Sequence, residues 1–248
     1  MNIFKIFLNL NHYPLSFLIC FYYCIFGVIM IIFGLFGKTG CGKTEILNEL
    51  KKKYSVVDIE GCANNKGSIL GDLYDLSSNT QEEFDACLEK QRKIAENTGY
   101  CIVEFEGRRI GGRTKVTIPE PFSDLKCYEH NIVVNCPYEC QIKRLLNWYL
   151  PKNEVEKEIL IDKFIDLKSA LSKPEKIELM DEIVDLLKKD EYNDAAILIE
   201  EGLYSEHYLR HIGKVKHDLI INNEDILKST EEISKYIDEI LKKHGIKI

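Results

Sequence analysis

A short glycine-rich segment is the first part of this sequence that could do chemistry. Residues 37–44 read G-K-T-G-C-G-K-T, which matches the G-x4-G-K-[ST] pattern of phosphate-binding loops. Glycines let backbone N–H groups approach phosphate oxygens without a Cβ in the way, and the helix expected to follow adds its positive N-terminal end. Lys43 would neutralise the distal phosphate, and Thr44 is placed to ligate Mg²⁺. The pattern predicts a polyphosphate ligand, either a nucleotide such as ATP or GTP or another diphosphate ester.

Acidic side chains follow two further segments that are expected to be strands. Asp58 and Glu60 end the first of them, and Glu104 and Glu106 end the second. Because the carboxyl ends of parallel strands face the ligand crevice, these carboxylates should lie near the phosphates, where they could support Mg²⁺ or act as a base. Strand alternation predicts that the two acids of each pair share one face.

A basic, glycine-bearing segment comes directly after the second acidic pair. Its cations are Arg108, Arg109, Arg113 and Lys115. Guanidinium groups bind phosphate oxygens through two parallel hydrogen bonds, so this segment could hold a second phosphate, a leaving diphosphate or an RNA backbone. Catalytic roles are expected for Lys43, Asp58, Glu60, Glu104, Glu106 and Arg108, and phosphate contacts for Gly37, Lys38, Thr39, Gly40, Cys41, Gly42, Lys43, Thr44 and Arg109.

The elements that must position these side chains alternate between strands and helices. Apolar runs predict strands at 31–36, 56–59, 100–105, 131–135 and 218–222. Helical periodicity predicts helices at 43–53, 81–97, 138–150 and 225–244, with about three more between 153 and 209. This alternation predicts an α/β domain of the P-loop NTPase type over residues 30–248. It should have a mostly parallel sheet, helices on both faces and a helical insertion at about 151–209.

Charge and cysteine content narrow the class of protein. The chain has 33 Lys and Arg against 40 Asp and Glu, a net charge of −7. Residues 151–202 hold 8 of those cations and 15 of those acids, which also gives −7, so the remaining residues are neutral overall. A local basic face for RNA is therefore compatible with the acidic total. The nine cysteines show no disulfide framework and are expected to be reduced thiols.

Residues 1–29 form an apolar leader for which the sequence leaves several interpretations open. No Lys, Arg, Asp or Glu occurs from Ile6 to Gly37. A run of that length is typical of a transmembrane helix, but its last part is needed as the strand before the phosphate-binding loop. We expect Met30 to be the natural start, residues 1–29 to be an upstream extension, and the protein to be cytoplasmic. A membrane anchor and a genuine extra helix are the alternatives.

Three motifs resemble, in order and spacing, the P-loop domain of the tRNA 2-selenouridine synthase family. They are TGCGKTEIL at 39–47, VVDIEGCANNKGS at 56–68 followed by Gly71, and IVEFEGRRIG at 102–111. The middle motif contains the block E-G-x-A-x-x-K-G-S, which is uncommon among P-loop proteins and therefore more specific than the phosphate-binding loop alone. Arg144 also matches an arginine of the family.

The resemblance implies a transferase that acts on 2-thiouridine at the wobble position of tRNA. In that family the thio group is geranylated with geranyl diphosphate and then replaced by selenium from selenophosphate. The phosphate-binding loop would accordingly hold a diphosphate ester, with Mg²⁺ as the expected cofactor, and Arg108 and Arg109 would neutralise the leaving diphosphate. Contacts to tRNA or substrate are then expected from Lys66, Gly67, Ser68, Arg113, Lys115 and Arg144.

The chain also departs from the family pattern. Asn65 and Lys66 stand where the family has His-Arg, and Gly107 replaces a serine. The family's rhodanese-like domain, with its chalcogen-handling cysteine, has no counterpart in the 29 residues before Met30. We therefore expect that domain to be a separate rhodanese-like polypeptide, and this chain to be half of a split enzyme.

Other classes of protein stay open on the sequence alone. An ATP-dependent kinase of nucleosides or nucleotides explains the phosphate-binding loop, Asp58 and a basic lid, but not the E-G-x-A-x-x-K-G-S block. A non-catalytic module would bind nucleotide tightly without turnover. A membrane-anchored NTPase depends on residues 1–29.

Overall fold

A parallel β-sheet forms the centre of the protein, for which the computed structural model describes residues 30–68, 70–74, 78–112, 115–205 and 215–247. The sheet has five strands in the order β2-β3-β1-β6-β7. Their bounds are β1 (Ile31–Phe36), β2 (Val56–Val57), β3 (Tyr100–Glu104), β6 (His130–Asn135) and β7 (Leu219–Asn222), and the short 3-10 helix η1 (Leu125–Cys127) precedes β6. The predicted α/β class with a parallel sheet is confirmed.

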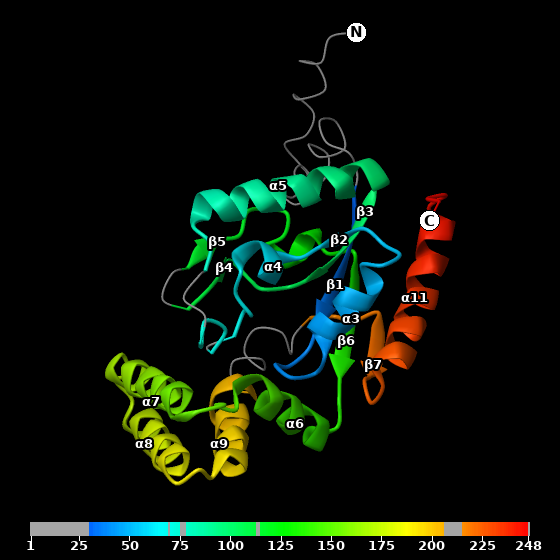
Figure 1. Ribbon diagram of the computed structural model, residues 1–248. Helices are drawn as coiled ribbons and strands as arrows, with labels where there is room; N and C mark the ends of the chain where they lie inside the picture. The colour runs from blue at the N-terminus through cyan, green and yellow to red at the C-terminus, as the bar shows by residue number, and fades with distance from the viewer. Residues whose placement is uncertain (1–29, 69, 75–77, 113–114, 206–214, 248) are drawn as a thin grey trace, which may run out of the picture.

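Helices cover both faces of this sheet (Figure 1). Alternate residues of β1 point to opposite sides. Phe33 and Leu35 pack with α3 (Lys43–Leu50) and α11 (Ile226–Lys243). Ile32 and Phe36 pack with α4 (Ile59–Ala63) and α5 (Gln81–Thr98). Because both faces are covered, every residue of β1 is buried, which explains why this strand is apolar throughout.

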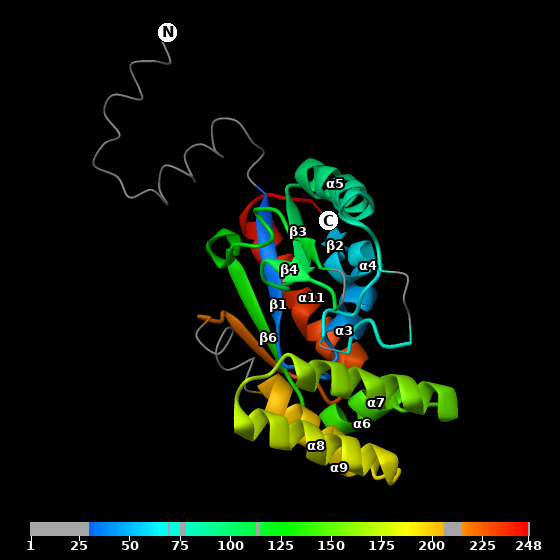
Figure 2. The same cartoon turned by 90° about the vertical axis from the view of Figure 1, so that its left-hand side faces the viewer.

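A group of helices, called here the helical module, lies at the carboxyl ends of the strands (Figures 1 and 2). It comprises α6 (Tyr138–Tyr149), α7 (Glu154–Ser169), α8 (Pro174–Lys188), α9 (Tyr192–Ile199) and the π-helix η2 (Glu200–Ser205). These helices share a core of their own, which includes Phe164 and Ile183. Leu70 and Leu73 belong to the same core, so the module packs against the segment that follows α4.

A buried ion pair joins the helical module to the segment after α4. Lys163 Nζ on α7 lies 2.6 Å from Asp72 Oδ1, and the two side chains are only 11% and 8% exposed. Lys163→Met removes this largely buried pairing of opposite charges, so it should lower the free energy of unfolding by about 2 kcal/mol in urea denaturation. The control Lys168→Met, on the same helix as Lys163, removes an exposed pair with Asp181 of α8 and should cost less than about 1 kcal/mol. Equal losses would contradict this view of the pair.

The structure differs from the sequence prediction in three places. β2 ends at Val57 because Asp58 caps α4: its Oδ1 accepts from the Gly61 N–H at 2.8 Å. The basic segment after β3 contains β4 (Arg109–Ile110), which pairs antiparallel with β5 (Val116–Thr117). A disulfide joins α4 to α5 through Cys62 and Cys87, so the expectation that all cysteines are reduced thiols is wrong.

Within the described part of the chain, none of the helices combines the length and the apolar character that crossing a bilayer requires. Residues 1–29, and with them the predictions of an upstream extension or a membrane anchor, lie outside the described residues.

Candidate functional site

The segment between β1 and α3 curls around the N-terminal end of α3. Gly40 and Gly42 have φ angles of 86° and 89°, in the left-handed region that favours glycine. Gly42 is the N-cap of α3, and it provides no side chain to bond the N–H groups of the first turn. Those N–H groups, together with the positive end of the helix dipole, form a binding site for an anion.

Lys43 lies at the centre of this segment. Its Nζ donates to the carbonyls of Gly37 and Lys38 at 2.9 and 3.1 Å, and it lies 3.2 Å from Glu104 Oε1. Burial by itself would lower the pKa of Lys43, but the negative charge of Glu104 and of other nearby groups raises it above its usual value. Lys43 is therefore a permanent cation inside the phosphate-binding loop.

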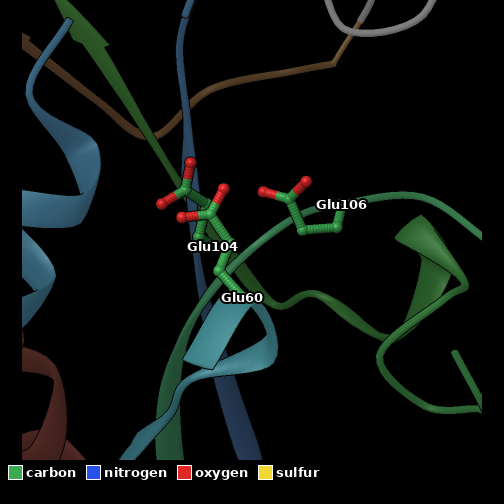
Figure 3. Close-up of side chains that lie close together, drawn as sticks. All are labelled: Glu60, Glu104 and Glu106. Carbon is green, nitrogen blue, oxygen red and sulfur yellow. The ribbon is translucent and has the colours of Figure 1, made fainter. Parts of the chain in front are cut away.

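Three carboxylates, called here the acid cluster, converge beside the loop (Figure 3). Glu60 comes from α4, Glu104 from the end of β3, and Glu106 from the segment that follows β3. One oxygen of each carboxylate lies within 4.8 Å of the other two. Thr44 Oγ1 is 3.3 Å from both Glu60 Oε2 and Glu104 Oε2, so the hydroxyl predicted to ligate Mg²⁺ contacts the cluster.

Burial and the crowding of like charges shift Glu60 and Glu106 toward their protonated forms. Burial, and then the charge of Glu104, raise the pKa of Glu60 to about 8. Burial, followed by the charges of Glu60 and Glu104, raises the pKa of Glu106 well above its usual value. Carboxylate and hydroxyl oxygens are the ligands that Mg²⁺ prefers, and a divalent cation would relieve the repulsion among them. The acid cluster and Thr44 therefore fit the expected cofactor by their chemistry.

The segment after α4 closes over the acid cluster. Gly67, with φ of 67°, packs so closely that a Cβ at this position would clash with the carboxylates of Glu60 and Glu106. The next residue, Ser68, places its Oγ 2.7 Å from the hydroxyl of Tyr149 on α6. The glycine of the E-G-x-A-x-x-K-G-S block thus packs its backbone against the acid cluster. The serine of the same block connects the segment to the helical module.

Asp58 is the N-cap of α4 and lies at the start of that helix. Strand alternation does not extend beyond Val57, so the interpretation that Asp58 and Glu60 share a strand face is wrong. Asp58 caps α4, and its Oδ2 lies 3.4 Å from Lys51 Nζ. Glu60 reaches the acid cluster from the first turn of α4 instead.

Of the basic residues predicted to bind phosphate, tRNA or substrate, some are exposed to solvent and one borders the phosphate-binding loop. Lys66, Arg108, Arg109 and Lys115 are exposed to solvent, where they are accessible to a large anionic ligand. Arg113 lies outside the described residues. Arg144, predicted to contact substrate or tRNA, donates from Nη1 to the Gly40 carbonyl at 3.3 Å and therefore borders the phosphate-binding loop itself.

Three buried polar residues that the sequence analysis did not single out also contact this loop. Gln141, Glu200 and Asn223 are 3%, 1% and 0% exposed. Glu200 Oε1 accepts from Lys38 Nζ at 3.0 Å, which joins the loop to η2 of the helical module. The pair of asparagines at the end of the last strand was the one visible signal for Asn223, and no spacing rule links it to the loop.

Comparison with known proteins places the chain in a group of relatives. A family profile described as the tRNA 2-selenouridine synthase AAA domain matches residues 30–208. An uncharacterized protein of Methanocaldococcus jannaschii is 57% identical over 220 residues, which cover 89% of this chain and 97% of that protein.

Two enzymes called tRNA 2-selenouridine synthase also match. The one from Hydrogenovibrio crunogenus is 28% identical over 139 residues, covering 55% of this chain and 37% of that enzyme. The one from Shewanella frigidimarina is 31% identical over 119 residues, covering 47% of this chain and 30% of that enzyme. The match to this chain thus spans about a third of the length of each of these synthases.

Proposed function

Because the chain belongs to the family of tRNA 2-selenouridine synthase AAA domains, we propose that it is the diphosphate-binding part of a tRNA-modifying transferase. The matched residues, 30–208, include the phosphate-binding loop and the acid cluster. The observation that carries the proposal is the convergence of a permanent cation, Lys43, with three carboxylates suited to Mg²⁺. A diphosphate needs both kinds of positive charge to be bound and to act as a leaving group.

The proposed substrates are geranyl diphosphate and 2-thiouridine at the wobble position of tRNA. The C1–O bond of geranyl diphosphate breaks, the thio sulfur bonds to C1, and the thioamide proton passes to water or to a carboxylate. Lys43 and the N–H groups of the loop would stabilise the charge that develops on the leaving diphosphate. Mg²⁺ held by the acid cluster and Thr44 would supply further positive charge there. We assign the exposed Arg108 and Arg109 to the same diphosphate or to the tRNA backbone.

The replacement of sulfur by selenium is proposed to need a second protein. Selenophosphate would supply the selenium, and a separate rhodanese-like protein would supply the chalcogen-handling cysteine. The synthases extend well beyond the region that matches this chain, so the proposal assigns the remaining chemistry to another polypeptide.

The modified nucleoside tests this proposal. The full chain is incubated with Mg²⁺, geranyl diphosphate and tRNA that contains 2-thiouridine, and the digested nucleosides are analysed by mass spectrometry. We expect geranylated 2-thiouridine, and the selenated nucleoside once selenophosphate and a rhodanese-like protein are added. Unmodified tRNA together with phosphoryl transfer from ATP to a nucleoside or nucleotide would instead identify a small-molecule kinase, the alternative class.

A further inference from the structure

Three successive carbonyls of the phosphate-binding loop are held from outside by side chains. Gln141 Nε2 donates to the Thr39 carbonyl at 2.8 Å. Arg144 Nη1 donates to the Gly40 carbonyl at 3.3 Å. Asn223 Nδ2 donates to the Cys41 carbonyl at 2.7 Å. The donors come from α6 and from the segment between β7 and α11. Two separate parts of the fold therefore hydrogen-bond to the loop.

The direction of these carbonyls sets the direction of the next N–H groups. A trans peptide is planar, and its N–H points opposite to its C=O. Carbonyls of Thr39 and Cys41 that face outward therefore turn the N–H groups of Gly40 and Gly42 inward. Within the described ranges of the chain, neither of these two N–H groups is bonded to a protein acceptor. The Cys41 N–H, by contrast, closes a turn onto the Lys38 carbonyl at 3.2 Å.

Asn223 is itself fixed in one orientation. Its side chain is fully buried, and its Oδ1 accepts from Ser229 Oγ at 3.0 Å. Its backbone N–H donates to the Asn135 carbonyl at 2.6 Å. Because the Cys41 carbonyl can only accept, the NH₂ end of the Asn223 amide must face it, and the Oδ1 end accepts from the Ser229 hydroxyl.

Gln141 is fixed by a carboxylate in the same way. Its Nε2 donates both to the Thr39 carbonyl and to Glu200 Oε1, the latter at 3.0 Å. An ionised carboxylate only accepts, so Glu200 determines that the NH₂ end of Gln141 lies between the carboxylate and the loop.

The side chains of Asn223 and Gln141 also pack directly against the two glycines. A Cβ at Gly42 would clash with Asn223 Nδ2, and a Cβ at Gly40 would come within 3.0 Å of Gln141 Cγ. The outer side of the loop is therefore filled by these side chains, and the loop has little room to rotate its peptide planes away from the inward direction.

We propose that Gln141 and Asn223 are positioning residues that orient the Gly40 and Gly42 N–H groups toward a bound diphosphate. The inference rests on the proposed function only in that the loop holds a diphosphate. Neither side chain has to touch the ligand, because each acts through one peptide group of the loop.

The test is the affinity of the full chain for inorganic pyrophosphate, measured by titration calorimetry. Gln141→Met and Asn223→Leu keep similar volume but remove the donor, and each should weaken binding by about tenfold. Two neighbouring exposed amides provide the matched controls: Asn147→Met on α6, and Asn222→Leu at the end of β7 beside Asn223, should bind like the wild type.

A second measurement separates positioning from general damage. Mn²⁺ binding to the acid cluster without pyrophosphate should stay within about twofold of wild type in both test variants, because, among the described residues, neither amide is hydrogen-bonded to the cluster. If Asn223→Leu fails to fold, Ser229→Ala removes only the hydroxyl that orients Asn223, and it should weaken pyrophosphate binding by about threefold.

The outcomes are distinguishable. Folded Gln141→Met and Asn223→Leu variants that bind pyrophosphate as tightly as wild type would overturn the inference and leave the proposed function standing. Equal losses of pyrophosphate and Mn²⁺ affinity would overturn it as well, because they indicate a structural role. A wild-type chain that binds no pyrophosphate would overturn both.

Discussion

Replacing Lys43 by methionine is expected to weaken pyrophosphate binding by about 100-fold, the largest single effect in this site. Lys43 is 12% exposed, and its Nζ sits between two loop carbonyls and Glu104. A ligand phosphate would exchange those carbonyls for charge-assisted hydrogen bonds, which methionine cannot make. Calorimetric titration at saturating Mg²⁺ measures the loss.

The same variant should also be less stable without ligand. Removing Lys43 leaves the buried Glu104 without its counter-ion, so the thermal midpoint of the ligand-free protein should fall, and Mg²⁺ should restore part of it. Lys52→Met is the matched control, because Lys52 is 70% exposed and its ion pair is with Glu49, three residues earlier. Wild-type affinity in folded Lys43→Met would mean that the diphosphate binds elsewhere.

Glu104→Gln should remove most of the Mg²⁺ dependence of pyrophosphate binding. Glu104 is 5% exposed, and its two oxygens contact Lys43 and Thr44. Glutamine has the same shape without the charge, so Mg²⁺ would lose a central ligand while Lys43 still attracts the phosphates. We expect the enhancement by Mg²⁺ to shrink by at least about tenfold relative to wild type.

Variants of the other two members of the acid cluster show how the three carboxylates share the Mg²⁺ effect. Glu60→Gln and Glu106→Gln, measured in the same way, rank the three carboxylates by their contribution to the Mg²⁺ effect. The control is Glu49→Gln on α3. The Glu49 carboxylate pairs with Lys52, and its replacement should leave the Mg²⁺ effect unchanged. An undiminished Mg²⁺ effect in Glu104→Gln would place the cation outside the acid cluster.

The phosphate-binding loop could be predicted from the sequence because its parts are contiguous. The strand that precedes it, the two left-handed glycines and the start of α3 all fall within residues 31–50. The ends of α5 were equally predictable, since Thr80 and Glu83 form a capping box and Gly99 is the left-handed C-cap. In these places the local chemistry of one short segment decides the structure.

Glu60 follows a segment in which the apolar pattern favours a strand and the capping residue Asp58 favours a helix. The run V-V-D-I-E reads as a strand, but the Asp58 carboxylate bonds the Gly61 N–H and starts a helix after only two strand residues. Glu60 still reaches the acid cluster, from a different element than the one expected. Alternation along a strand therefore could not describe the geometry of this pair.

Contacts between distant parts of the chain account for what sequence reasoning missed. Gln141 and Thr39 are 102 positions apart, and Asn223 and Cys41 are 182 positions apart. Single amides carry no spacing pattern, so only the fold reveals that they hold the same loop. The pair Lys38 and Glu200 is hidden for the same reason, with 162 positions between its members.

The measurement that tests the central claim most directly is a ligand comparison on the full chain. Affinities for geranyl diphosphate, ATP and GTP are measured side by side, with and without tRNA that contains 2-thiouridine. The proposed function predicts that geranyl diphosphate binds most tightly, that the tRNA strengthens its binding, and that Lys43→Met abolishes it. A preference for ATP that the tRNA does not change would contradict the proposal and indicate a kinase or another NTPase.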